Sequence, residues 1–96
     1  MRVEFHPDAE ADANAAQQWY AERSAIAARA FLTELIASID RIAQSPEAWP
    51  PYLAGTRRYF FPKFPFSLVY RVAGNTITVV AVAHHRRKPG YWSNRH

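Results

Sequence analysis

The sequence contains no cysteine among its 96 residues, so disulfide bridges and thiolate metal ligands are excluded. No apolar run approaches the roughly 20 residues that a transmembrane helix needs, and residues 1–4 lack the pattern of a secretory signal. The chain has only three glycines, and none belongs to a glycine-rich phosphate-binding loop. The length predicts one domain over residues 1–96, and these absences predict a soluble cytoplasmic protein with neither a metal nor a cofactor.

Acidic residues are missing from the second half of the chain. All eight carboxylates lie in residues 1–50 with four arginines, whereas residues 51–96 hold eight Lys or Arg residues. The first half therefore carries a formal charge of −4 and the second half +8. A basic half without acids favours a phosphate backbone or an acidic protein segment as partner; a surface that only maintains solubility is the alternative.

Two amphipathic helices are predicted in the acidic half. Pro7 suits the first position of a helix that runs to about Glu22, with small apolar residues at helical spacing. Ser24 is a good N-cap for a longer second helix, whose stripe of large aliphatic residues ends before Ser45-Pro46. Because the connection is short, the two helices should form an antiparallel hairpin.

Four strands complete the predicted fold. The segment Arg2–His6 is a short strand candidate, and Thr56–Phe61 is a second. The segments Phe66–Val72 and Thr76–His84 are rich in β-branched and aromatic residues, and Gly74-Asn75 forms the turn between them. The order βααβββ predicts an α+β domain: an antiparallel sheet with the helical hairpin on one face and the other face open.

The turn also predicts which side chains share a face of the last hairpin. A two-residue loop sets Ala73 opposite Thr76 and brings Lys63 near Arg86. Side chains alternate along a strand, so the predicted core face holds Phe66, Leu68, Tyr70, Val72, Ile77, Val79, Ala81, Ala83 and His85. The predicted open face holds Ser67, Val69, Arg71, Thr76, Thr78, Val80, Val82 and His84, with Arg58 and Phe60 from the preceding strand.

The segments LVYRVAGNTITVVAVAHHRRKPGYW (Leu68 to Trp92) and HPDAEADANAAQQWYAER (His6 to Arg23) resemble the RelE/ParE superfamily of bacterial type II toxins. The resemblance covers nearly the whole chain. It implies a small βααβββ toxin of plasmid-stabilisation and stress-response loci, with an antitoxin that wraps its sheet and neutralises it. RelE-like members cut messenger RNA in the ribosome, and ParE-like members inhibit DNA gyrase.

The two modes differ at Ser67. Ribonuclease members usually place an arginine just before the LVY of the third strand, to hold the scissile phosphate, and here Arg58 and Arg71 are the nearest candidates to replace it. Basic and aromatic residues after the last strand also matter in the nucleases. The resemblance thus predicts a ParE-like, non-nuclease target, with an mRNA endoribonuclease and an inactive antitoxin-binding module as alternatives.

An RNA-cleaving site would need a base, an acid and cations for the transition state. His84 or His85 could move a proton near neutral pH. Strand parity allows only one of them on the open face: the register selects His84, and alignment with histidine-bearing family members selects His85. Because the two point apart, they also make no metal site.

The candidate residues fall into two groups. The catalytic candidates are His84, His85, Arg86 and Tyr91. The candidates for contact with the target or a phosphate are Arg58, Lys63, Ser67, Arg71, Arg87, Lys88 and Trp92. For Pro89–Trp92 two placements are open: stacking on a nucleic-acid base, or folding back on the sheet edge.

Overall fold

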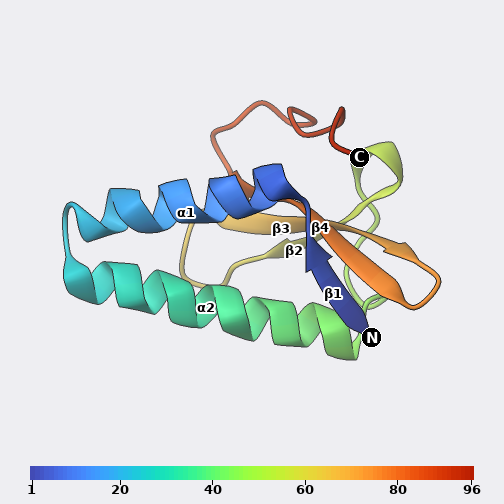
Figure 1. The fold of residues 1–96 in the computed structure, drawn as a ribbon, viewed down its shortest axis with the longest axis horizontal. Coiled ribbons are helices and arrows are strands. Elements are labelled where there is room, and N and C mark those ends of the chain that lie inside the picture. The colour runs from blue at the N-terminus through green and yellow to red at the C-terminus, as the bar shows by residue number, and fades with distance from the viewer.

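The computed structural model describes residues 1–96 and consists of a helical hairpin packed on a four-stranded sheet (Figure 1). The elements follow the predicted βααβββ order. In chain order they are β1 (Arg2–Phe5), α1 (Pro7–Ala21), α2 (Ala25–Gln44), the short 3₁₀ turn η1 (Leu53–Gly55), β2 (Arg57–Phe60), β3 (Phe66–Ala73) and β4 (Thr76–His84). The predicted α+β fold class is confirmed.

The strands lie in the order β1-β4-β3-β2. Strands β2, β3 and β4 pair antiparallel, as predicted, but β1 runs parallel to β4. Parallel pairing needs a long crossover, which here includes the helical hairpin. The sheet is therefore mixed rather than purely antiparallel, and β1 ends at Phe5, opposite Val79.

Local sequence explains where both helices begin. Pro7 occupies the first turn of α1, and the His6 Nδ1 atom accepts a hydrogen bond from the Asp8 N–H at 3.0 Å. Helix α2 begins after Ser24, whose Oγ accepts from the Ala27 N–H at 3.1 Å. Neither helix combines the length and apolar character that crossing a membrane requires.

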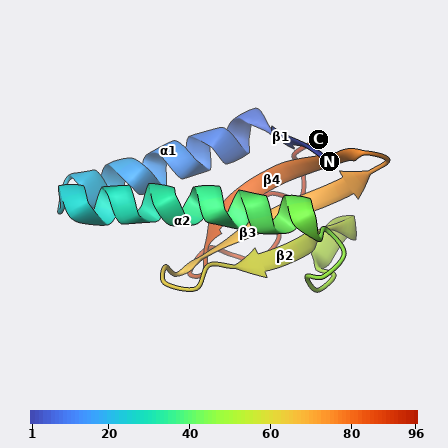
Figure 2. The ribbon, with the colours of Figure 1, turned by 90° about the horizontal axis from the view of Figure 1, so that it is seen from below.

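The main core lies between the helices and the sheet, with Phe31 of α2 at its centre. Phe31 is fully buried and packs its ring against four other aromatic rings at centroid distances of 5.2–5.8 Å. Those rings belong to Tyr20, Phe61, Phe64 and Phe66. Seen from below, α2 lies in front of the sheet (Figure 2), so the helix covers this face with its aromatic and aliphatic side.

A β-bulge changes the predicted register halfway along the last hairpin. From the turn as far as Tyr70 opposite Val79 the predicted pairing is confirmed, but Val69 then lies opposite Ala81. Val80 is the extra residue, and such a bulge leaves two residues of one strand facing one of its partner. Every pair beyond the bulge is shifted by one residue.

The shift exchanges the two faces of the second half of β4. Val82 packs in the main core, whereas Ala81 packs on the opposite face with Val80. The predicted core positions Ala81, Ala83 and His85 and the predicted open-face positions Val82 and His84 are therefore wrong. A prediction from strict alternation cannot detect one inserted residue, because the insertion inverts the parity of everything that follows it.

The face opposite the helices is not bare. The C-terminal segment, defined here as residues 85–96, folds back across it (Figure 1), and Trp92 is only 1% exposed. Trp92 forms a second, smaller cluster with Val69, Val80 and Ala81, and Tyr52 packs against this cluster. The prediction of an open sheet face is corrected accordingly: the segment covers its middle with an aromatic side chain.

Phe31 provides a test of this packing. We expect Phe31→Ala to lower the free energy of unfolding by about 3–5 kcal/mol, because it empties the centre of the aromatic cluster. Ile26→Ala on the same helix is the matched control, since Ile26 is 75% exposed, and its effect should stay within about 0.5 kcal/mol. Urea unfolding followed by circular dichroism measures both; equal losses would contradict the described core.

Candidate functional site

A largely buried ion pair fixes the C-terminal segment at the point where β1 ends. The Asp12 carboxylate of α1 accepts from Arg95 Nη1 at 2.6 Å and from Arg95 Nη2 at 3.3 Å. It also accepts from the Tyr91 hydroxyl at 3.1 Å and from the Val82 N–H at 3.2 Å. Arg95 in turn donates to the Val80 carbonyl at 3.0 Å. The pair thereby satisfies backbone groups of β4 that β1 is too short to reach.

This arrangement determines the protonation of Tyr91. Burial, reinforced by the Asp12 charge and hydrogen bond, raises the pKa of Tyr91 to about 12. The pKa of Arg95 is raised as well, because its contacts with Asp12 outweigh the opposing effect of burial. Tyr91 thus keeps its proton, and its hydroxyl is occupied by the hydrogen bond to Asp12.

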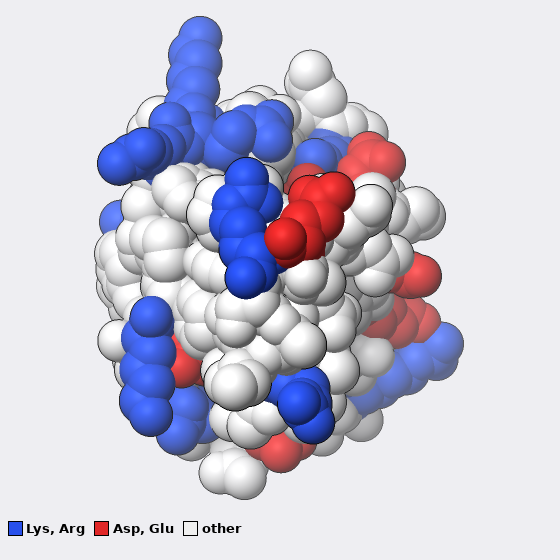
Figure 3. Space-filling view, turned by 90° about the vertical axis from the view of Figure 1, so that its left-hand side faces the viewer, with Lys and Arg blue, Asp and Glu red and all other residues white.

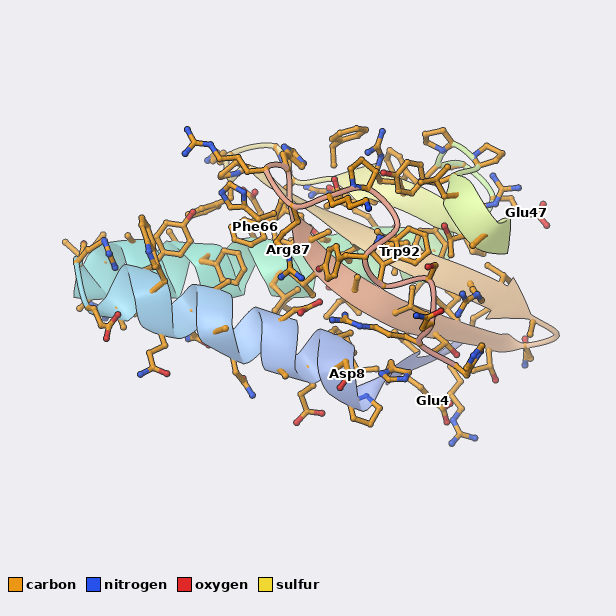
Figure 4. The ribbon with its side chains drawn as sticks, turned by 90° about the horizontal axis from the view of Figure 1, so that it is seen from above. Glu4, Asp8, Glu47, Phe66, Arg87 and Trp92 are labelled. Carbon is orange, nitrogen blue, oxygen red and sulfur yellow. The ribbon has the colours of Figure 1, made fainter.

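A groove of about 740 Å³ lies between α1 and the end of β4, and we call it the α1–β4 groove. It has an apolar floor that includes Ala16, Phe66 and Val82, and cations at its rim. The lining residues are Asp12, Ala15, Ala16, Trp19, Tyr20, Pro65, Phe66, Val82, His84, His85, Arg86, Arg87 and Tyr91. Viewed from above, Arg87 lies beside Phe66 on the α1 side, and Trp92 lies over the strands (Figure 4).

The cations that follow β4 form the basic cluster, Arg86, Arg87 and Lys88. All three are exposed, and none forms a salt bridge with a carboxylate; the Arg87 guanidinium lies 3.8 Å from the Tyr91 ring centroid. Figure 3 shows Lys and Arg side chains gathered at the upper edge, the side on which Figure 1 draws the C-terminal segment. The cluster thus offers positive charge that no acid of this chain neutralises.

Lys63 belongs to the turn between β2 and β3. Its side chain is exposed, and its backbone N–H donates to Glu34 Oε2 of α2 at 2.9 Å. The His85 N–H donates to the Pro65 carbonyl at 2.9 Å, which holds this turn beside the end of β4. Lys63 therefore lies at the same end of the sheet as the basic cluster.

Ser67 and His85 form a pair on the sheet face opposite the helices. Ser67 is 1% exposed, and a hydrogen bond of 2.9 Å joins its Oγ to His85 Nε2. Arg58 borders the same small cavity of about 50 Å³, with its guanidinium 4.0 Å from the Tyr52 ring centroid and 4.4 Å from that of Phe60. Phe60 also contacts the His85 ring, at 5.3 Å between centroids.

Burial lowers the pKa of His85 below the usual 6.5, and the nearby positive charges of His84 and Arg58 act in the same direction. A backbone hydrogen bond at Phe66 opposes this shift but does not cancel it. The imidazole is therefore neutral at physiological pH, although Arg58, Arg87 and Lys88 line the same cavity.

The two histidines contact opposite faces, as predicted, but the register assigned them in reverse. His84 packs its ring against the core residue Phe66 at 5.0 Å, and its Nδ1 accepts from the Arg86 N–H at 3.0 Å. His85 is the histidine that reaches Ser67, as alignment with family members predicts. No three His, Asp or Glu side chains converge in the way a metal site requires.

Arg71 is separated from the Ser67 cavity. Its Nη1 donates to the Arg95 carbonyl at 3.0 Å, so it holds the end of the C-terminal segment. Of the two arginines predicted to replace the missing one, only Arg58 lines the cavity at Ser67. Trp92 also folds back and is buried, but it lies over the sheet face and not at the sheet edge, where one of its two predicted placements put it.

Sequence reasoning missed the two residues that anchor the segment, Asp12 and Arg95. A signal for Asp12 is present: it lies within the small-residue stripe of Ala9, Ala13 and Ala16, at the edge of the buried face of α1. A carboxylate at that position needs a partner when the helix packs. No comparable signal marks Arg95, because its contact spans 83 residues.

Comparisons with known proteins agree with this geometry. A family model described as "ParE toxin of type II toxin-antitoxin system, parDE" matches residues 3–89. A solved structure of the "Chromosomal ParDE TA system from P. aeruginosa" is similar, with a TM-score of 0.77 and 19% sequence identity over 88% of this chain and 95% of that chain. At this identity the likeness shows a shared fold. The comparison with curated proteins gives no match.

The family-model match identifies this helical hairpin on a four-stranded sheet as a toxin of the RelE/ParE superfamily. Because the matched region spans nearly the whole sequence, the chain belongs to the ParE toxin family. It is thus the toxin component of a type II toxin–antitoxin system, and its partner is a cognate antitoxin.

The Asp12 anchor can be tested by hydrogen exchange. Asp12→Ala removes the acceptor of three groups and leaves Arg95 partly buried without its counter-ion, so the free energy of unfolding should fall by about 2–4 kcal/mol. The amides of Tyr91, Ser93 and Arg95, which are hydrogen-bonded within the segment, should exchange at least about tenfold faster. Asp8→Ala is the control, because Asp8 is exposed and lies 3.8 Å from Arg95. Unchanged protection of the segment in Asp12→Ala would contradict the anchor.

The His85 pKa provides a second test. In an NMR pH titration the His85 ring should titrate below the same histidine in the urea-unfolded chain, because the fold disfavours its charged form. The unfolded chain then binds the proton more readily. The contribution of His85 to stability is therefore present above about pH 6.5 and is lost as the pH falls through the lowered folded-state pKa. A higher midpoint in the folded chain would refute this assignment.

Proposed function

We propose that this toxin inhibits DNA gyrase and does not cleave RNA, with the basic cluster and the α1–β4 groove as its contact surface. The observation that supports this proposal most directly is the serine at position 67. At the position where nuclease relatives usually hold the scissile phosphate with arginine, this chain has a buried serine bonded to a neutral histidine. ParE-like members of the superfamily act on gyrase, and the family match is to that branch. Gyrase acts in the cytoplasm, so the proposal locates the toxin there.

The other catalytic candidates also support a non-nuclease mode. Tyr91 donates to Asp12 and has a raised pKa, and His84 is turned toward the core residue Phe66. His85 keeps its place at the Ser67 cavity, where Arg58, Arg87 and Lys88 supply positive charge. A proton acceptor and cations, without a placed acid, make an incomplete site for cleaving a phosphodiester.

The antitoxin, in this proposal, covers the same surface. The groove supplies an apolar floor for a helix or strand, and the exposed cations at its rim favour a partner segment that carries acidic residues. Occupation of the groove would block Arg86 and Arg87 from the target, which explains neutralisation without any change in the toxin's fold.

Two alternatives remain as outcomes of the test. An mRNA endoribonuclease is favoured by one observation, the shared cavity of Arg58 and His85. An inactive antitoxin-binding module would keep the groove and lose only the effect on the target. Mapping transcript ends after induction detects the first, and harmless overexpression with retained antitoxin binding detects the second.

Replacing Arg86 and Arg87 together by Ala tests the proposed contact surface. We expect the half-inhibitory concentration in a gyrase supercoiling assay to rise at least about tenfold, because two unpaired cations at the rim are lost. Growth arrest on induction should disappear as well.

The matched control is the double variant Arg2→Ala, Arg41→Ala. It removes two exposed arginines that lie outside the groove and the cavity, and it should inhibit like the unchanged toxin. Inhibition that survives the loss of Arg86 and Arg87 would reject the surface. Supercoiling that is unaffected by the unchanged toxin would reject gyrase as the target.

A further inference from the structure

The outward side of α2 carries an apolar stripe that no part of this chain covers. Leu32 is 37% exposed and Ile36 is 53% exposed. Ala25 and Ala43 lie on the same stripe, because separations of seven and four residues return to nearly the same side of a helix. Large central residues flanked by small ones allow another helix to approach along the whole length.

Two charges flank this stripe and have no partner within the chain. Arg29 and Asp40 are both exposed, and neither forms a salt bridge or a side-chain hydrogen bond. They are eleven residues apart, which is three turns and about 16 Å along the helix, so they project from the same side. One end of the stripe is thus positive and the other negative.

This pattern is self-complementary about a two-fold axis on the outward side of α2, at the level of Glu34 along the helix. When two copies of α2 cross antiparallel there, Leu32 of each copy meets Ile36 of the other, and Ala25 meets Ala43. Arg29 of each copy then lies beside Asp40 of the other, which gives two equivalent ion pairs. In a parallel pairing Arg29 of one copy and Asp40 of the other would lie about 16 Å apart along the helix axis, so neither ion pair could form.

We propose that the toxin self-associates through α2, with a second copy of this chain as the partner. Helix α2 lies on the side of the molecule opposite the C-terminal segment (Figures 1 and 2). Self-association therefore leaves the α1–β4 groove and the basic cluster free, and a dimer presents two such surfaces. This inference does not depend on gyrase being the target. One helix pair is a small interface, so the dimer is weak and depends on concentration.

Charge reversal tests the pairing directly. Sedimentation equilibrium on the purified chain measures the dimer dissociation constant of the unchanged toxin, Arg29→Asp and Asp40→Arg. Each single reversal turns both ion pairs into repulsions and should raise the constant by about tenfold or more. An equimolar mixture of the two single variants should dimerise like the unchanged toxin, since each mixed pair restores two opposite-charge contacts.

The matched control is Glu10→Arg, which reverses an exposed charge on α1 away from the stripe and should leave the dissociation constant within about twofold. Circular dichroism checks that every variant keeps the fold. A toxin that stays monomeric at all concentrations overturns the proposal. So does a dimer that is indifferent to both reversals, or a mixture that fails to recover.

Discussion

The C-terminal half of the molecule depends on the contact between Asp12 and Arg95. Strand β1 stops opposite Val79, so the next stretch of β4 lacks a neighbour on that side. The ion pair supplies one: Asp12 accepts from the Val82 N–H and Arg95 donates to the Val80 carbonyl. Asp12 of α1 and Arg95 of the C-terminal segment thus make the hydrogen bonds that a neighbouring strand would otherwise make. Both side chains are largely buried, so removing either would leave an unpaired charge and unpaired backbone groups.

This anchor also places the basic cluster. Residues 85–96 are fixed at one end by the end of β4 and at the other by Arg95, with Trp92 buried between them over Val69 and Ala81. The exposed part of this segment contains Arg86, Arg87 and Lys88, which therefore project beside the α1–β4 groove. Burial of the Trp92 ring restricts the conformations of the segment. It thereby holds Arg86, Arg87 and Lys88 in one place, although no acidic residue pairs with these three cations.

Element order and helix caps could be predicted because they depend on neighbouring residues: Pro7 and Ser24 begin the helices as expected, and Gly74-Asn75 closes the hairpin. The bulge at Val80 could not be predicted from the sequence. It falls in a run of small and β-branched residues that fit either face of a strand, so nothing in the composition marks the inserted residue. That single residue moved His84 to the core side and His85 to Ser67. The parallel edge and the covered sheet face were missed for another reason, since both result from contacts between opposite ends of the chain.

The pair of Ser67 and His85 shows how the chain tolerates so much positive charge at one end. Arg58, Arg87 and Lys88 border its cavity, and no acidic residue follows Glu47 in the sequence. An arginine at position 67 would add a buried cation to this ring, and nothing on that face could neutralise it. A serine needs only one hydrogen bond, and a histidine with a lowered pKa supplies it without charge. Ser67 and His85 are both neutral, which lets β3 pack at this position. With serine in place of arginine, the group that would hold a phosphate is absent, so packing and the proposed loss of nuclease chemistry share one cause.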